Sequence, residues 1–118
     1  MIKFYNKNGE MYDLSIENIR KDPKQCSWVD IVNLQTLSEE FIREFLDYLN
    51  WRNISFYQSL SQDFIREFKD KVNWADISFE QKLSKEFIVE FIDKIDFRLI
   101  LMNDNISKEI KDYCRMFT

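Results

Sequence analysis

The apolar positions of this chain recur with a period of 23 residues. An aromatic residue opens each unit, at Trp28, Trp51, Trp74 and Phe97. An isoleucine follows three residues later, at Ile31, Ile54, Ile77 and Ile100, and no insertion breaks the register. A fixed period of this length is typical of stacked two-helix units, because one such unit cannot bury its own apolar face.

Within one unit the pattern predicts two helices. Good N-cap residues stand just before the opening aromatics, at Ser27, Asn50, Asn73 and Asp96, so a short helix should begin after each. A serine recurs as a second N-cap, at Ser38, Ser61, Ser84 and Ser107. After Ser61, the residues Phe64, Ile65, Phe68 and Val72 form one apolar stripe, which predicts a second helix of about eleven residues.

The expected fold is all-α, a short right-packed array of two-helix repeats similar to an α-solenoid. We expect a single domain over residues 1–118, with full repeats at 28–50, 51–73 and 74–96. Residues 97–118 form a degenerate C-terminal capping repeat. Residues 1–27 are expected to form an N-terminal β-hairpin, predicted by Asn8-Gly9 between β-prone residues, followed by a short capping helix.

The repeated unit reads Trp51-x-x-Ile54-Ser55-x-x-Gln58-x-Leu60-Ser61-x-x-Phe64-Ile65-x-x-Phe68. It resembles a short helical repeat found in proteins of phages, prophages and giant viruses. The resemblance covers the chain from Trp28 to about Ile110 and implies a viral or mobile-element origin, but no activity. The first unit departs from it with Val32 in place of serine, and the fourth with Leu101, Asp104 and Lys111.

Composition narrows the chemistry. The chain has no histidine, and Gly9 is its only glycine, which excludes imidazole catalysis and Gly-rich phosphate loops. We therefore expect no enzymatic activity, no cofactor and no metal site. The net charge of -4 disfavours nucleic-acid binding and favours a protein partner with a basic surface.

The two cysteines and the hydropathy pattern bear on location. Cys26 and Cys114 are far apart in the sequence, without CxxC spacing, and are expected to be free thiols in a reducing compartment. No apolar run approaches the length of a membrane span, and the N-terminus lacks the apolar stretch of a signal peptide. The expected protein is a monomer or weak homodimer in the cytoplasm, that of the host cell if it is viral.

Two surfaces could bind a partner. Carboxylates recur on one flank of the second helix, at Glu40, Glu44, Asp47, Asp63, Glu67, Asp70, Glu86, Glu90 and Asp93. Stacking would align them as an acidic ladder, although i,i+4 pairs of Arg43 with Asp47 and of Arg66 with Asp70 would neutralise part of it. A solvated face that keeps the repeats soluble is the alternative interpretation.

The other surface is a row on the outer side of the first helix, at Phe56, Tyr57, Phe79 and Met102. An exposed apolar row of this kind is typical of a protein-binding site, and the alternative is that it packs against the adjacent unit.

These features favour a non-catalytic protein-interaction module, in which the acidic ladder occupies a basic surface of a host nucleic-acid-handling or defence protein. The defence role rests on the resemblance. One alternative is a structural protein that self-associates through its repeats. Another is direct nucleic-acid binding through surface lysines, at Lys69, Lys71, Lys82, Lys85 and Lys94.

Overall fold

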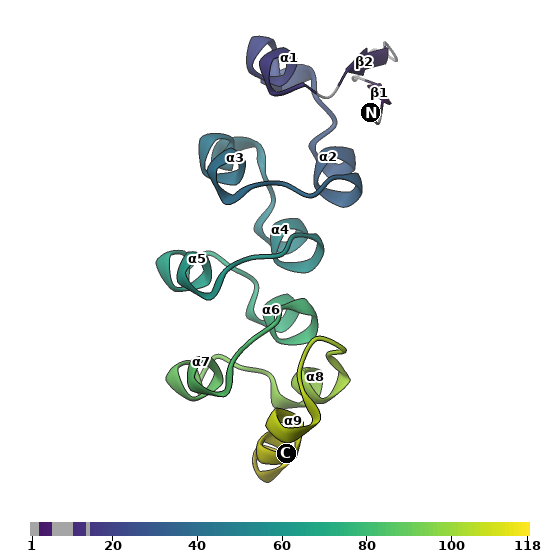
Figure 1. Cartoon of the computed structure of the whole chain (residues 1–118). Coiled ribbons are helices and arrows are strands. Elements are labelled where there is room, and N and C mark those ends of the chain that lie inside the picture. The colour runs from purple at the N-terminus through teal and green to yellow at the C-terminus, as the bar shows by residue number, and fades with distance from the viewer. Residues whose placement is uncertain (1–2, 6–10, 14) are drawn as a thin grey trace.

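The computed structural model describes residues 3–5, 11–13 and 15–118, and its helices stand in two columns (Figure 1). One column holds the opening helices of the units, α2 (Trp28–Leu34), α4 (Trp51–Tyr57), α6 (Trp74–Glu80) and α8 (Phe97–Met102). The other holds α1 (Ile16–Lys21), α3 (Glu39–Glu44), α5 (Gln62–Glu67) and α7 (Lys85–Glu90). The molecule is elongated, at 52 × 23 × 18 Å. The described part is mainly helical, which confirms the predicted all-α class.

The helices begin where the sequence predicts, because polar side chains cap their first turns. The hydroxyls of four serines each accept from the backbone N–H three residues on, at the starts of α3, α5, α7 and α9 (Lys108–Cys114). Asn50, Asn73 and Asp96 cap α4, α6 and α8 in the same way. Ser27 precedes α2 as predicted, but its hydroxyl donates to the carboxylate of Asp30 instead.

The second helix of each unit is shorter than predicted. α5 has six residues and ends before Phe68, whereas the sequence pattern predicts about eleven. The N–H groups of Lys71 and Val72 donate to the Phe68 carbonyl at 2.9 and 3.0 Å, so a turn replaces the rest of the helix. This turn returns the Val72 side chain to the core, where it is buried. In the first unit the 3₁₀ turn η2 (Leu46–Tyr48) stands in the same place.

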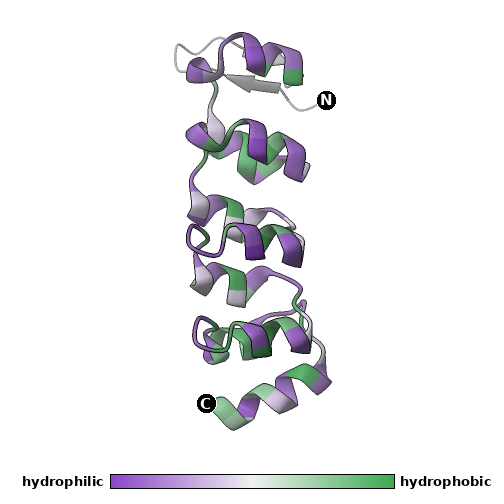
Figure 2. Ribbon diagram, turned by 90° about the vertical axis from the view of Figure 1, so that its left-hand side faces the viewer, coloured by the Kyte–Doolittle hydropathy of each residue, from purple (hydrophilic) through white to green (hydrophobic). Residues whose placement is uncertain are grey.

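The core lies between the two columns. Fully buried isoleucines project into it at Ile31, Ile54, Ile77 and Ile100 from the first column and at Ile42, Ile65 and Ile88 from the second. Figure 2 shows that each short helix carries both hydrophobic and hydrophilic residues, as expected of amphipathic helices. The half-buried ring of Trp51 packs against Phe64 and Phe68, with centroids 6.3 and 5.0 Å away. The tryptophan therefore joins the two helices of its own unit.

Buried glutamine side chains join the second and the third unit to the unit before each of them. The amide nitrogen of Gln58 donates to the carbonyls of Val32 and Gln35 at 2.6 and 2.7 Å, and its amide oxygen accepts from the Leu37 N–H at 2.8 Å. Gln81 makes the same three bonds one unit later. A side-chain amide can donate twice and accept once, which suits the unpaired carbonyls at the end of a helix.

In the fourth unit an asparagine takes this role one residue earlier than expected. The 23-residue register places Asp104 there, but α8 is one residue shorter than α6 and ends before Asn103. The amide nitrogen of Asn103 donates to the carbonyls of Ser78 and Gln81, each at 2.9 Å. Asp104, which departs from the repeat at the glutamine position, could not take this role, since an ionised carboxylate cannot donate these bonds.

The two ends of the array differ from its middle. Strands β1 (Lys3–Tyr5) and β2 (Met11–Asp13) pair antiparallel. The turn expected between them falls on residues 6–10, outside the described residues, so the hairpin itself stays a prediction. At the other end, α9 lies beside α8 instead of continuing the second column (Figure 1). Phe97 stacks there on Phe117 of the 3₁₀ turn η3 (Arg115–Phe117), with centroids 4.7 Å apart.

Candidate functional site

All nine carboxylates of the acidic ladder are exposed, but part of the ladder is paired within the molecule. Arginines of the preceding unit hold three of its glutamates, in the pairs Arg20–Glu44 and Arg43–Glu67, each at 2.6 Å, and Arg66–Glu90 at 2.9 Å. Asp63 also pairs with Arg66, at 2.8 Å. The three arginine–glutamate contacts run along the second column from one helix to the next, whereas the Asp63–Arg66 contact lies within α5.

The predicted i,i+4 pairs within a unit are wrong. Arg43 contacts Glu67 rather than Asp47, and Arg66 contacts Glu90 and Asp63 rather than Asp70. The physical reason is the length of the helices. α3 ends at Glu44 and α5 at Glu67, so each aspartate lies beyond the helix end, where an offset of four residues no longer places two side chains on one face.

The arginines also cover aromatic rings of the next unit. The Arg43 guanidinium carbon lies 5.1 Å from the Phe64 ring centroid, and that of Arg66 lies 5.2 Å from the centroid of Phe87. The hydrogen bond from Arg20 lowers the pKa of the Glu44 carboxyl below its ordinary value. We call the three pairs Arg20–Glu44, Arg43–Glu67 and Arg66–Glu90 the arginine–glutamate seam. The seam links successive helices of the second column, and its glutamates are less available to a partner.

The other five carboxylates of the acidic ladder make no ion pair with another described residue. They are Glu40, Asp47, Asp70, Glu86 and Asp93. They do not form a uniform negative strip, because exposed lysines stand beside them in the chain. Lys69 and Lys71 flank Asp70, and Lys94 follows Asp93. The surface therefore offers a basic partner a weaker field than the sequence pattern predicts.

The outer row is the second candidate surface, and the structure brings part of it together. The rings of Phe56 and Phe79, from α4 and α6, lie 6.2 Å apart between centroids, and Tyr57 meets Phe56 edge to face at 4.8 Å. Tyr57 is 50% exposed and Met102 is 61% exposed. The two phenylalanines thus pack across the unit boundary, as the alternative interpretation expects, while tyrosine and methionine face solvent.

Sequence reasoning missed one member of this surface. Leu34 holds the position of Tyr57 in the first unit, and its side chain is 56% exposed at the end of α2. The signal was the 23-residue register itself, which aligns the two residues. We call Leu34, Phe56, Tyr57, Phe79 and Met102 the outer strip.

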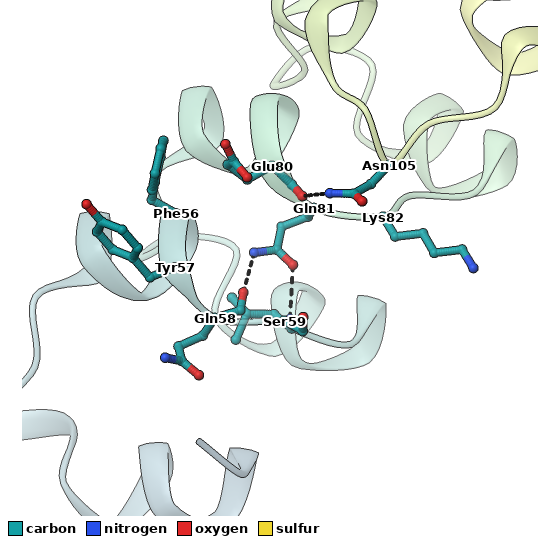
Figure 3. Close-up of a pocket in the computed structure, with 9 residues that line it drawn as sticks. Phe56, Tyr57, Gln58, Ser59, Glu80, Gln81, Lys82 and Asn105 are labelled. Atoms are coloured by element: carbon teal, nitrogen blue, oxygen red, sulfur yellow. Dashed lines mark hydrogen bonds between the residues drawn. The ribbon is translucent and has the colours of Figure 1, made fainter. Parts of the chain in front are cut away.

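Two hollows flank the middle of the outer strip. One has a volume of about 310 Å³ and is lined by aromatic, amide and charged side chains, including Phe56, Tyr57, Glu80, Lys82 and Asn105 (Figure 3). The other, of about 380 Å³, is lined by the same two aromatic residues together with Asn50, Arg52, Asn53 and Asp76. Phe56 and Tyr57 thus line both hollows, which gives this part of the surface relief that a partner can fit.

Few other groups in the described part offer reactive chemistry. Both cysteines are buried, no disulfide joins them, and burial raises the pKa of the Cys114 thiol. Among the described residues no cluster of three or more histidine, cysteine or acidic side chains is placed to hold a metal ion. The lysines proposed for nucleic acid are exposed, and Lys85 lies over the Tyr113 ring at 4.3 Å. No helix within the described ranges is long and apolar enough to cross a membrane.

No protein-family model matches the chain, and no curated protein or solved structure is significantly similar to it. The resemblance of the repeat to viral proteins therefore stays a prediction. So do the absence of enzymatic activity and the cytoplasmic location.

Proposed function

We propose that the chain is a non-catalytic protein-interaction module, built as an α-solenoid-like array of two-helix repeats, that binds a protein segment on its outer strip. The observation that carries the proposal is the exposure of Tyr57, Met102 and Leu34 beside the packed pair of Phe56 and Phe79. Exposed aromatic and methionine side chains are enriched at the energetic centres of protein interfaces.

The packing behind the strip supports this choice. The glutamine bonds fix the ends of α4 and α6, the two helices that carry the aromatic residues, against their neighbours. A site on rigid helices loses little conformational freedom when it binds, so more of the contact energy appears as affinity. The acidic ladder is the weaker candidate, because arginines of the same chain occupy three of its glutamates.

The surface does not identify the partner protein. A host nucleic-acid-handling or defence protein as target rests on the viral resemblance alone, and it stays a prediction.

Capture experiments with matched variants test the proposal. The double variant Tyr57→Ser/Met102→Ser removes exposed apolar area from the outer strip, and Val29→Ser removes it from α2 outside the strip. Immobilised wild-type protein and the Val29→Ser variant should retain the same proteins from a lysate at high salt, and the double variant should lose them. Captured proteins that bind the double variant equally well, or that salt alone releases, would contradict the proposal.

A second candidate is self-association through the C-terminal end. Val89 stands at the register position of Arg43 and Arg66, so the arginine–glutamate seam does not continue beyond α7. Val89, on α7, and Ile92, two residues after its end, are both exposed. Sedimentation equilibrium tests it. A mass that rises with concentration in the wild type, but not in Val89→Asp/Ile92→Asp, supports assembly, and a constant monomer mass excludes it.

A further inference from the structure

Three carboxylates in the described part of the chain are half-buried, and they differ in their partners. Glu39 accepts hydrogen bonds from the N–H and hydroxyl of Ser61, at 2.6 and 3.0 Å. Asp76 lies 3.7 Å from the Arg52 guanidinium. The Glu80 carboxylate makes no hydrogen bond or ion pair with any described residue. The Glu80 carboxylate is therefore free to accept hydrogen bonds from a cation brought by a ligand.

Glu80 stands at the wall of the 310 Å³ hollow beside the outer strip. Figure 3 shows Phe56 and Tyr57 on one side of this hollow, with Glu80 next to them. Lys82 also lines it, but its side chain extends to the opposite side, away from the two rings (Figure 3). Aromatic faces attract cations, and a carboxylate at the same wall adds a charged acceptor.

The pairing of an aromatic residue, Tyr57, with a carboxylate, Glu80, occurs at a single unit boundary of the described array. The register position of Tyr57 holds leucine in the first unit, glutamate in the third and asparagine in the fourth, at Leu34, Glu80 and Asn103. Tyr57 and Glu80 therefore lie in successive units of the column. The boundary before them pairs Leu34 with Tyr57 and has no carboxylate. At the boundary after them Asn103 is buried, and its amide donates to the backbone carbonyls of the third unit. The described array thus offers one such site instead of a repeated row.

We infer that the hollow between Tyr57 and Glu80 binds the cationic side chain of an arginine or lysine in the protein segment that lies along the outer strip. The inference rests on the proposed function and names the chemistry of the partner. The volume is at the small end for ligand sites, which suits one long side chain better than a drug-sized molecule.

The rest of the strip defines what flanks that cation. Phe56 lines the hollow and packs on Phe79, so an apolar residue next to the cation in the partner segment meets these rings. Met102 and Leu34 extend the apolar surface along the same column of helices. The expected segment therefore carries one arginine or lysine between apolar residues.

A random peptide library displayed on phage is the probe for this chemistry. Wild-type protein should enrich peptides that carry arginine or lysine beside leucine, phenylalanine or methionine. Glu80→Gln keeps the size of the side chain and removes its charge, so it should still enrich apolar residues but lose the preference for the cation. Glu86→Gln is the matched control, because Glu86 is an exposed carboxylate on α7 outside the hollow, and it should select the same peptides as the wild type.

An enriched peptide then allows a direct measurement of the contact. Replacing its arginine by citrulline, a neutral analogue of similar shape, should weaken binding to the wild type roughly 10-fold, the scale of one hydrogen bond to a charged group. The same replacement should change the affinity for Glu80→Gln little, since the charged acceptor is already gone. Thermal unfolding followed by circular dichroism checks that each variant is folded.

The outcomes separate this inference from the proposed function. Equal affinities of the arginine and citrulline peptides for the wild type would overturn the inference and leave the outer strip as a purely apolar site. Peptides that bind Tyr57→Ser/Met102→Ser as well as the wild type would overturn the proposed function. A library that yields no peptide above background would count against both.

Discussion

Gln81 donates a hydrogen bond of 2.6 Å from its side-chain amide to the backbone carbonyl of Gln58, the residue at the same position of the preceding unit. Gln58 makes the same bond to Gln35, at 2.7 Å. A polar side chain at the core thus links each helix of the first column to the next. Because these groups are buried, removing one amide leaves two carbonyls and one N–H without partners.

Replacing Gln81 with leucine should therefore destabilise the protein strongly. Each buried backbone group left without a partner costs about 1–3 kcal/mol, so we expect a loss of roughly 3 kcal/mol or more in the free energy of unfolding. Urea unfolding followed by circular dichroism measures the difference between the two proteins.

Gln35→Leu is the matched control for this measurement. Gln35 holds the same register position, but its side-chain amide makes no hydrogen bond with another described residue. Its replacement should change the free energy of unfolding much less. Equal losses in the two variants would show that the cost comes from the residue type and not from the bonds across the unit boundary.

The starts of the helices could be predicted from the sequence because each depends on one local residue. The hydroxyl of Ser61 caps α5 by accepting from an N–H three residues on in the chain, and Asn73 does the same at α6. The place where a helix ends depends on packing instead. α5 stops before Phe68 so that Val72 can return to the core, and no local signal such as glycine or proline marks that point.

The arginine–glutamate seam could not be read from helical spacing within one unit. Arg43 reaches Glu67, 24 residues on, which is one period plus one residue. The available signal was the adjacent pair Arg43-Glu44 and its repeat at Arg66-Glu67, which places an arginine of one unit beside a glutamate of the next once the units are stacked. The outer strip followed from the register, but only the structure showed which of its rings pack and which are exposed.

The ion pair between Arg20 and Glu44 should make stability depend on acidic pH. The pKa of the Glu44 carboxyl is lowered in the folded protein, chiefly by its hydrogen bonds from Arg20. A group whose folded pKa lies below its unfolded value of 4.5 stabilises the fold above that value. This contribution is lost as the pH falls through the folded pKa.

Glu44→Gln tests this pH dependence. The melting temperature of the wild type should fall more steeply than that of the variant as the pH is lowered from 6 to about 3, because glutamine does not titrate. The two proteins should differ least at the acidic end of the series. Parallel curves over the whole range would show that the pair with Arg20 does not contribute.

The Cys114 thiol should be unreactive in the native protein. Its side chain is buried, and burial raises the pKa, so the reactive thiolate is both inaccessible and scarce near neutral pH. In a Cys26→Ser variant, which isolates this thiol, a chromogenic disulfide reagent should react at the rate at which the protein opens. The rate should rise to that of a free thiol in urea. Fast reaction in native buffer would contradict the burial of this residue in the C-terminal unit.

Reversing the glutamates of the arginine–glutamate seam should weaken the fold, and not only a binding surface. The interpretation of Glu44, Glu67 and Glu90 as an unpaired ladder predicts that changing all three to lysine leaves the fold intact or relieves repulsion. In the structure each of them faces an arginine of the preceding unit, so reversal places two cations together at three successive boundaries. The melting temperature should therefore fall. It should recover in part when Arg20, Arg43 and Arg66 are changed to glutamate in the same protein.

A second triple variant controls for the change in net charge. Glu40, Asp70 and Glu86 are exposed and make no ion pair with another described residue, so their conversion to lysine adds the same charge without breaking a pair. This control should melt close to the wild type in physiological salt, where exposed charges are screened beyond about 8 Å. If the variant with the three reversed glutamates also melts like the wild type, the ion pairs do not contribute to stability, and the acidic ladder is again a candidate binding surface. If it melts lower and the swapped protein recovers, the three glutamates stabilise the array and the outer strip is the surface left for a partner.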